Sequence, residues 1–124
     1  MTQANTQANV QIIRFAHFYN EGTRGAAGNA PQNDKVWGIA KVNNTLVNFW
    51  GRRNGVLKFK TRFLSEMSVV QAKYEEKIGG RKTGDVYTAV SNPAMMSMLC
   101  PKLEADVSKH YYSAMSLGKL NTKH

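Results

Sequence analysis

Apolar and polar residues alternate most clearly over residues 56–63 of this 124-residue chain. Successive side chains of a strand point to opposite faces, so this run predicts a strand with one apolar face. The other face of that strand carries Lys58, Lys60 and Arg62. The pattern therefore predicts a single solvent-facing row of cations along one strand.

Four further runs have the composition of strands. They cover residues 10–18, 35–42, 45–50 and 85–90. Asn43 and Asn44 separate two of these runs and tolerate the positive φ of a tight turn, which predicts a hairpin. Ile12 and Ile13 interrupt the alternation of the first run. Residues 20–34 are rich in glycine and asparagine and predict a long loop.

The second half of the chain has apolar residues at helical spacing. The first set comprises Val70, Tyr74 and Ile78. Ser68 and Gln71 have the spacing of a capping box at the start of this helix. Gly79 and Gly80 are suited to end it, because glycine readily adopts the left-handed conformation of a helix C-cap.

A helical extension is expected over residues 92–118. Asn92 and Pro93 suit the cap and the first position of a short helix, which Pro101 would end. A longer helix is predicted by the apolar set Leu103, Val107, Tyr111, Ala114 and Leu117. The short helix carries Met95, Met96 and Met98. Methionine suits cores and protein contacts alike, so we expect core packing first and contact with a partner or a second copy as the alternative.

The composition is that of one folded domain. Hydrophobic residues make up 42% of the chain and charged residues 20%, which is ordinary globular usage. We expect a flexible tail over residues 1–9 and a single domain over residues 10–124. The single Cys100 excludes an internal disulfide, and the sequence shows neither a signal peptide nor an apolar run of membrane-spanning length. These features favour an intracellular protein of the cytoplasm, nucleoid or nucleus, without a membrane partner.

The charge balance points to a polyanionic partner. The chain has 17 Lys and Arg against 8 Asp and Glu, a formal net charge of +9. Residues 50–82 hold nine of these basic residues and three acidic ones. Lys and Arg release the counterions condensed on phosphates, and aromatic side chains pack on bases, so nucleic acid is the expected partner. The alternative is a solvated sheet face whose charges serve solubility.

The tripeptide Trp50-Gly51-Arg52 resembles the signature of the WGR domain, a nucleic-acid-binding domain found in poly(ADP-ribose) polymerases. The order of the flanking segments is also similar to that family. Residues 34–37 (Asp-Lys-Val-Trp) precede the tripeptide, and residues 82–87 (Lys-Thr-Gly-Asp-Val-Tyr) close a WGR-like core of about residues 34–90. The resemblance implies an α+β fold, a twisted antiparallel sheet of about four to five strands with one helix packed on it, here followed by the C-terminal helices.

The resemblance also implies a function. In family members that bind DNA breaks, the motif tryptophan packs on a terminal nucleotide while nearby basic residues hold phosphates. The nucleic-acid-binding residues expected here are Trp50, Arg52, Arg53, Lys58, Lys60, Arg62, Arg81 and Lys82. The expectation is a non-enzymatic protein that binds DNA, at ends or as single strands, through a basic sheet face and the Trp50 hairpin. The alternative for Trp50 is a residue that only packs the sheet.

Other functions stay open at this point. Stacking and phosphate contacts suit RNA as well as DNA. A protein-interaction or assembly protein would use the WGR-like face together with the methionine-rich C-terminal segment. An enzyme is not expected, because no nucleophile, base and orienting residue can be assigned. His17, His110, His124 and Cys100 lack metal-ligand spacing, so we expect neither a metal nor a cofactor.

Overall fold

The alternating runs form one antiparallel sheet. The structure is a computed structural model that describes residues 9–22, 32–53, 55–80 and 84–117. Its strands are β1 (Val10–Asn20), β2 (Asn33–Val42), β3 (Thr45–Arg52), β4 (Lys58–Phe63) and β5 (Thr88–Ala89). They lie in the order β4-β3-β2-β1-β5, and every neighbouring pair is antiparallel. The expected antiparallel sheet is confirmed, with β4 and β5 at its two edges.

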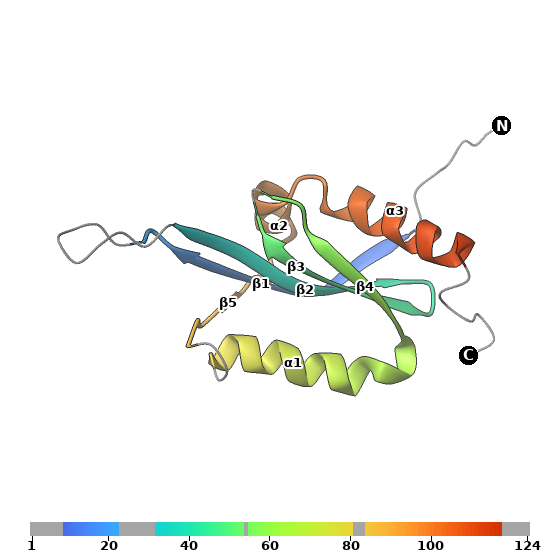
Figure 1. The fold of residues 1–124 in the computed structure, drawn as a ribbon, viewed down its shortest axis with the longest axis horizontal. Helices are drawn as coiled ribbons and strands as arrows, with labels where there is room; N and C mark the ends of the chain where they lie inside the picture. The colour runs from blue at the N-terminus through green and yellow to red at the C-terminus, as the bar shows by residue number, and fades with distance from the viewer. Residues whose placement is uncertain (1–8, 23–31, 54, 81–83, 118–124) are drawn as a thin grey trace.

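Helices cover both faces of this sheet (Figure 1). A 3-10 turn over Leu64–Glu66 leads from β4 into α1 (Met67–Gly79), which lies against β1 and β2 on one face. The short helix α2 (Pro93–Leu99) and the longer α3 (Leu103–Ser116) lie on the opposite face. The α+β class and the C-terminal helices are therefore confirmed, and the sheet is the middle of three layers.

Each face of the sheet has its own hydrophobic core. Phe49 and Val107 are fully buried in the core between the sheet and α2–α3. Ile39 and Val70 are fully buried in the core between the sheet and α1, where Trp37 is 5% exposed. Trp37 is thus a core residue, and residues of β2 and β3 alternate between the two cores.

The doubled isoleucine of the first strand marks a β-bulge. Ile12 lies opposite Ala40, but the register then shifts, so that Arg14 lies opposite Ile39. Ile12 consequently packs on the core under α2–α3, whereas Ile13 packs on the core under α1. Two adjacent apolar residues fit this strand because each serves a different face.

Two local signals in the sequence are confirmed by the backbone. Asn43 has a φ of 55° in the turn between β2 and β3, as the predicted hairpin requires. The Asn92 side chain caps α2, since its Oδ1 accepts a hydrogen bond from the Ala94 backbone N–H at 2.8 Å.

Three local predictions are wrong. Ser68 does not cap α1, because the 3-10 turn carries the chain into the helix before it, and Gln71 instead accepts a hydrogen bond from Arg14 Nε at 2.8 Å. Leu117 lies beyond the end of α3 and is 67% exposed. The strand expected over residues 85–90 is reduced to the two residues that pair with β1.

The methionine-rich segment is only partly core. Met96 packs against the core under α2–α3, while Met95 is 50% exposed and Met98 is 79% exposed. Core packing is therefore confirmed for one of the three methionines.

Some expectations concern segments outside the described ranges. The tail expected over residues 1–9 and the centre of the loop expected over residues 20–34 fall there, apart from their ends. Within the described ranges, none of the helices combines the length and the apolar character needed to cross a membrane.

Candidate nucleic-acid interface

The strand register places Trp50 beside the cations of β4. Trp50 lies opposite Lys58, and Asn48 lies opposite Lys60. Opposed residues of neighbouring strands share a face and lie within reach of each other. Trp50 packs on the core under α1, so the two lysines lie on the α1 face as well. The cation row and the WGR-like tripeptide thus meet on one face of the sheet.

Trp50 is partly buried. It lies opposite Trp37 of β2, whose ring packs on Tyr74 of α1 with the ring centres 6.2 Å apart. Helix α1 packs on β1 and β2, whereas Trp50 lies one strand further toward the edge. Trp50 is therefore anchored on the core and remains partly accessible to solvent.

Gly51 and Arg52 complete the tripeptide at the end of β3. Gly51 has a φ of +137°, a conformation that residues with a side chain rarely adopt. Arg52 is exposed, and its Nη1 lies 3.5 Å from the carbonyl oxygen of Gln32. Arg52 lies two residues after Trp50 in β3, opposite Lys35 of β2. Because side chains two residues apart in a strand share a face, Arg52 lies on the Trp50 side of the sheet.

The solvent-facing position predicted for Arg62 is wrong. Its side chain is 12% exposed, and its Nη1 lies 3.2 Å from Glu66 Oε1. Glu66 Oε2 also accepts a hydrogen bond from the Phe63 backbone N–H at 2.9 Å. The turn into α1 covers the end of β4, so Lys58 and Lys60 are the exposed members of the predicted row.

Arg53 also fails to join the expected site, because it lies on the α2–α3 face. Its Nη2 is 2.7 Å from Asp34 Oδ2, and its Nη1 donates to the carbonyl oxygen of Leu99 at 3.3 Å. His17 Nε2 lies 2.6 Å from Asp34 Oδ1. Hydrogen bonds from Arg53 and His17 hold the pKa of Asp34 below its ordinary value, although burial acts in the opposite direction. Arg53 thus ties the end of β3 to β2 and α2.

The importance of Asp34 was missing from the sequence-based expectations, where this residue only begins the WGR-like segment. A signal existed, because an acid inside an apolar strand needs a cation when it is buried. The hairpin register identifies this cation as Arg53, because it pairs the end of β3 with the start of β2 and so places Arg53 beside Asp34. The Arg53 backbone N–H confirms this closeness by donating to the Asp34 carbonyl oxygen at 2.8 Å.

Four other cations near this face either have partners or lie outside the described ranges. Lys35 Nζ lies 3.1 Å from Asp85 Oδ2. Lys77 Nζ lies 5.7 Å from the centre of the Tyr87 ring. Arg81 and Lys82, both expected in the site, belong to the segment that is not described.

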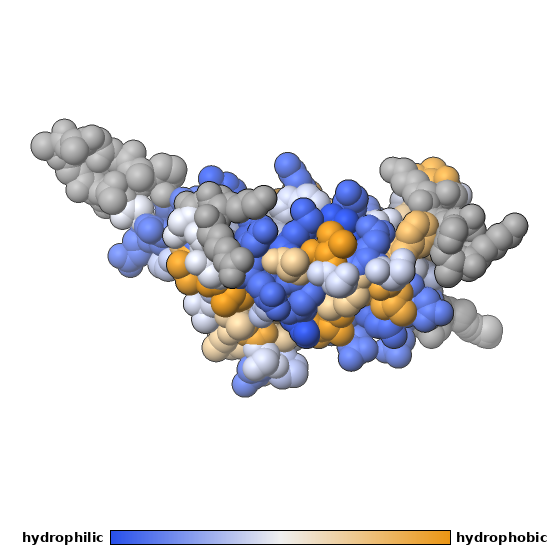
Figure 2. Space-filling view, turned by 90° about the horizontal axis from the view of Figure 1, so that it is seen from below, coloured by the Kyte–Doolittle hydropathy of each residue, from blue (hydrophilic) through white to orange (hydrophobic). Residues whose placement is uncertain are grey.

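Arg52, Lys58 and Lys60 therefore remain as the exposed cations around Trp50. Among the ion pairs that join described residues, none includes these three side chains. Hydrophilic residues cover much of the α1 face of the molecule, with apolar residues scattered among them (Figure 2). This arrangement can contact an anionic polymer through its charges and a flat apolar group through Trp50.

In the described part of the chain, no three His, Cys, Asp or Glu side chains lie close enough to share a metal ion.

The chain was also compared with known proteins. A scan against protein-family models found no match, and searches of curated proteins and of solved structures found none either.

Proposed function

We propose that this chain is a non-enzymatic nucleic-acid-binding protein of the cell interior that binds DNA through the Trp50 face, made of Trp50, Arg52, Lys58 and Lys60. The observation that carries the proposal is the pairing of Trp50 with Lys58 across β3 and β4. An aromatic platform and a row of cations without ion-pair partners among the described residues lie within reach of one ligand.

Each part of this face suits a different part of a nucleic acid. Lys and Arg side chains contact phosphates and release counterions, which gives affinity without reading sequence. An accessible indole stacks on a base, and stacking needs a base that is not already covered by a neighbour. The combination therefore favours single strands or the ends of a duplex over the interior of a duplex.

The WGR-like order of residues 34–90 supports the same choice. In that resemblance Trp50 matches the tryptophan that packs on a terminal nucleotide, and DNA is the polymer it implies. RNA stays an outcome of the test, because no described residue of the Trp50 face is specific for a 2′-hydroxyl group.

A polarisation titration with labelled oligonucleotides tests this proposal. Single-stranded DNA, blunt duplex DNA and single-stranded RNA of equal length would be titrated with the full chain at about 50 and about 200 mM salt. Three phosphate contacts predict a log–log salt slope of roughly −3 on duplex DNA and about −2 on a single strand.

The outcomes separate the alternatives. Salt-sensitive binding that is tighter to single-stranded or blunt-ended DNA than to RNA is the expected result. Tighter binding to RNA would overturn the assignment to DNA, and an affinity independent of salt, or no binding to any of the three polymers, would overturn the function itself.

A further inference from the structure

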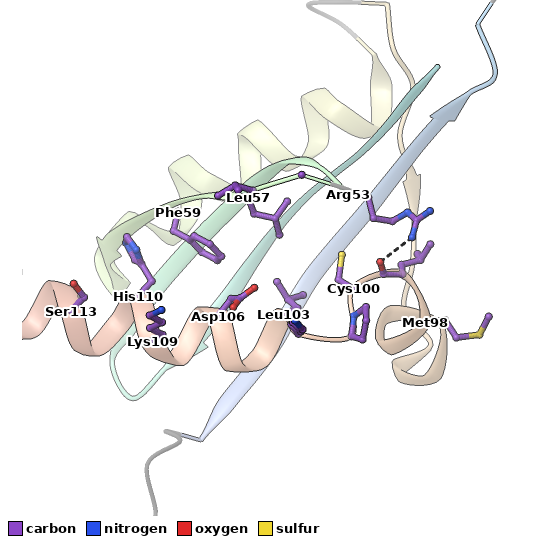
Figure 3. A pocket seen from close by; sticks show the side chains of 15 residues that line it. Arg53, Leu57, Phe59, Met98, Cys100, Leu103, Asp106, Lys109, His110 and Ser113 are labelled. Carbon is purple, nitrogen blue, oxygen red and sulfur yellow. Dashed lines mark hydrogen bonds between the residues drawn. The ribbon is translucent and has the colours of Figure 1, made fainter. Parts of the chain in front are cut away.

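A groove runs between the beginning of β4 and helix α3, on the face opposite the Trp50 face (Figure 3). Leu57 and Phe59 line its strand side, and Leu103 and His110 line its helix side. The rings of Phe59 and His110 stack with their centres 5.2 Å apart. The volume of the groove is about 780 Å³, which is the size of sites that hold several side chains or a small molecule.

The groove exposes apolar side chains at its rim. Val56 is 94% exposed and Met98 is 79% exposed, and both line the groove. Cys100 lines it as well, and burial raises the pKa of its thiol to about 11, so this thiol is uncharged at neutral pH. An apolar groove bordered by apolar side chains in solvent is typical of an interaction site rather than of a solvated surface.

Strand β4 offers a second means of recognition. It is the edge strand of the sheet, and among the described strands it pairs with β3 alone. An edge strand presents backbone N–H and C=O groups that an extended peptide can pair with, as in proteins that bind partners by adding a strand to a sheet. Alternate residues of an added strand would then point into the groove beside Phe59 and to the other face beside Lys58 and Lys60.

The charges indicate what kind of peptide fits. Lys102 and Lys109 are exposed where they line the groove, and Asp106 is the acid among its described lining residues. Lys58 and Lys60 add two exposed cations along the outer strand. A peptide with acidic residues complements both surfaces, whereas a basic peptide would meet like charges along its length.

From the groove, the edge strand and these charges, we propose that the chain binds an acidic, extended peptide segment of a partner protein as an added strand along β4. The apolar side chains of that segment occupy the groove between β4 and α3, and its acidic side chains, at the intervening positions, lie beside Lys58 and Lys60. This site shares Lys58 and Lys60 with the Trp50 face but uses neither Trp50 nor Arg52, and it does not depend on nucleic-acid binding.

A peptide selection tests the proposal directly. Random twelve-residue peptides displayed on phage would be selected against the immobilised full chain, and the enriched peptides would be synthesised and titrated by polarisation without nucleic acid. The expected peptides carry apolar residues at every second position and a net negative charge. Methylation of alternate backbone nitrogens should abolish their binding in one register and spare it in the other, because alternate N–H groups of a strand point toward its partner.

Matched variants locate the site on the chain. Val56→Asp and Met98→Glu place acids in the groove and should each weaken peptide binding by about tenfold or more. The controls Val69→Asp and Met95→Glu change side chains that are 51% and 50% exposed elsewhere, and they should leave the affinity unchanged. Equal melting temperatures of the four variants would show that folding is intact.

Three results would contradict the proposed peptide site. The proposal is overturned if no peptide is enriched, if the enriched peptides lack the alternating acidic pattern, or if the groove variants and the controls bind alike. Trp50→Ala should leave peptide binding intact, so loss of the nucleic-acid function and loss of this peptide site can be told apart.

Discussion

Trp37 and Trp50 lie opposite each other on neighbouring strands and pack on the same core, but they differ in exposure. Trp37 is 5% exposed, whereas Trp50 keeps part of its surface in solvent. Sequence alone leaves stacking and packing open for Trp50, because exposure depends on which strands α1 covers. The pair offers an internal comparison between a tryptophan that packs the core and one that is proposed to bind.

Replacement of each tryptophan by alanine separates these roles. Trp50→Ala should lower the affinity for single-stranded DNA by about 1–3 kcal/mol, the cost of losing one stacking platform. Trp37→Ala should instead cost about 3–5 kcal/mol of unfolding free energy, because it empties part of a core. Urea unfolding and polarisation on both variants measure the two quantities. A larger stability loss for Trp50→Ala than for Trp37→Ala, with unchanged affinity of the folded protein, would assign Trp50 to packing alone.

Gly38 of β2 lies where the neighbouring strands leave no room for a side chain. A Cβ at this position would overlap the Phe49 ring and lie 2.6 Å from the Arg14 carbonyl oxygen. Gly38→Ala should therefore force the ring or the strand to shift, at a cost of about 1–3 kcal/mol of unfolding free energy. Gly55→Ala is the control, because its nearest neighbour would be an Arg52 carbon at 3.5 Å. Urea unfolding that shows equal stability for the two variants would contradict the packing described for β2 and β3.

Asp34 links β1, β2, β3 and α2 through His17 and Arg53, and its lowered pKa makes this link sensitive to acid. A group whose folded pKa is depressed contributes stability that is present above its unfolded pKa, about 3.9 for Asp, and lost as the pH falls through the folded value. Asp34→Asn should lower stability at neutral pH by about 1–3 kcal/mol and reduce the further loss in acid. Urea midpoints between about pH 6 and about pH 2 measure this difference.

The control for Asp34 is another aspartate in a different setting. Asp106 is exposed on α3, and Asp106→Asn should retain the acid sensitivity of the unaltered chain. If Asp34→Asn and Asp106→Asn respond to acid in the same way, the junction at Asp34 does not contribute as described.

Elements with a strong local signal could be predicted from the sequence, and their relations in space could not. Asn43 acts through its own backbone conformation, and Asn92 acts through a side chain that caps the backbone two residues on, so the turn and the cap are visible in the sequence. The burial of Arg62 depends on Glu66 and on where α1 begins, which alternation along β4 cannot reveal. The groove between β4 and α3 is lined by residues about forty to fifty positions apart in the sequence, so no local sequence pattern predicts it.

The same limit applied to the candidate site. Register from one hairpin was enough to bring Trp50 and the lysines of β4 to one face, because alternation fixes which residues point together. The hairpin register also brings Arg53 to Asp34, but it does not reveal that Arg53 donates to Leu99, in a helix from a distant part of the chain.

At the scale of the whole molecule, the sheet lies between two helical layers, and the part of each layer near β4 is incomplete. Helix α1 leaves the Trp50 face accessible, and α3 leaves a groove beside the same strand. The edge strand can therefore serve two ligands, a nucleic acid through the Trp50 face and a peptide through the open strand edge and the groove, and both would use Lys58 and Lys60. The formal net charge of +9 attracts polyanions to any part of the surface, so a loss of charge alone does not identify the nucleic-acid site.

The most direct measurement is therefore a comparison of two double variants with the same charge. Lys58→Ala/Lys60→Ala removes exposed lysines from the Trp50 face, and Lys102→Ala/Lys109→Ala removes exposed lysines from the α2–α3 side. Polarisation titrations on single-stranded DNA at several salt concentrations should show weaker binding for the first variant, with a salt slope reduced by about 1.4, the share of two phosphate contacts. The second variant should keep the slope of the unaltered chain, and equal losses in both variants, or none in the first, would contradict the account.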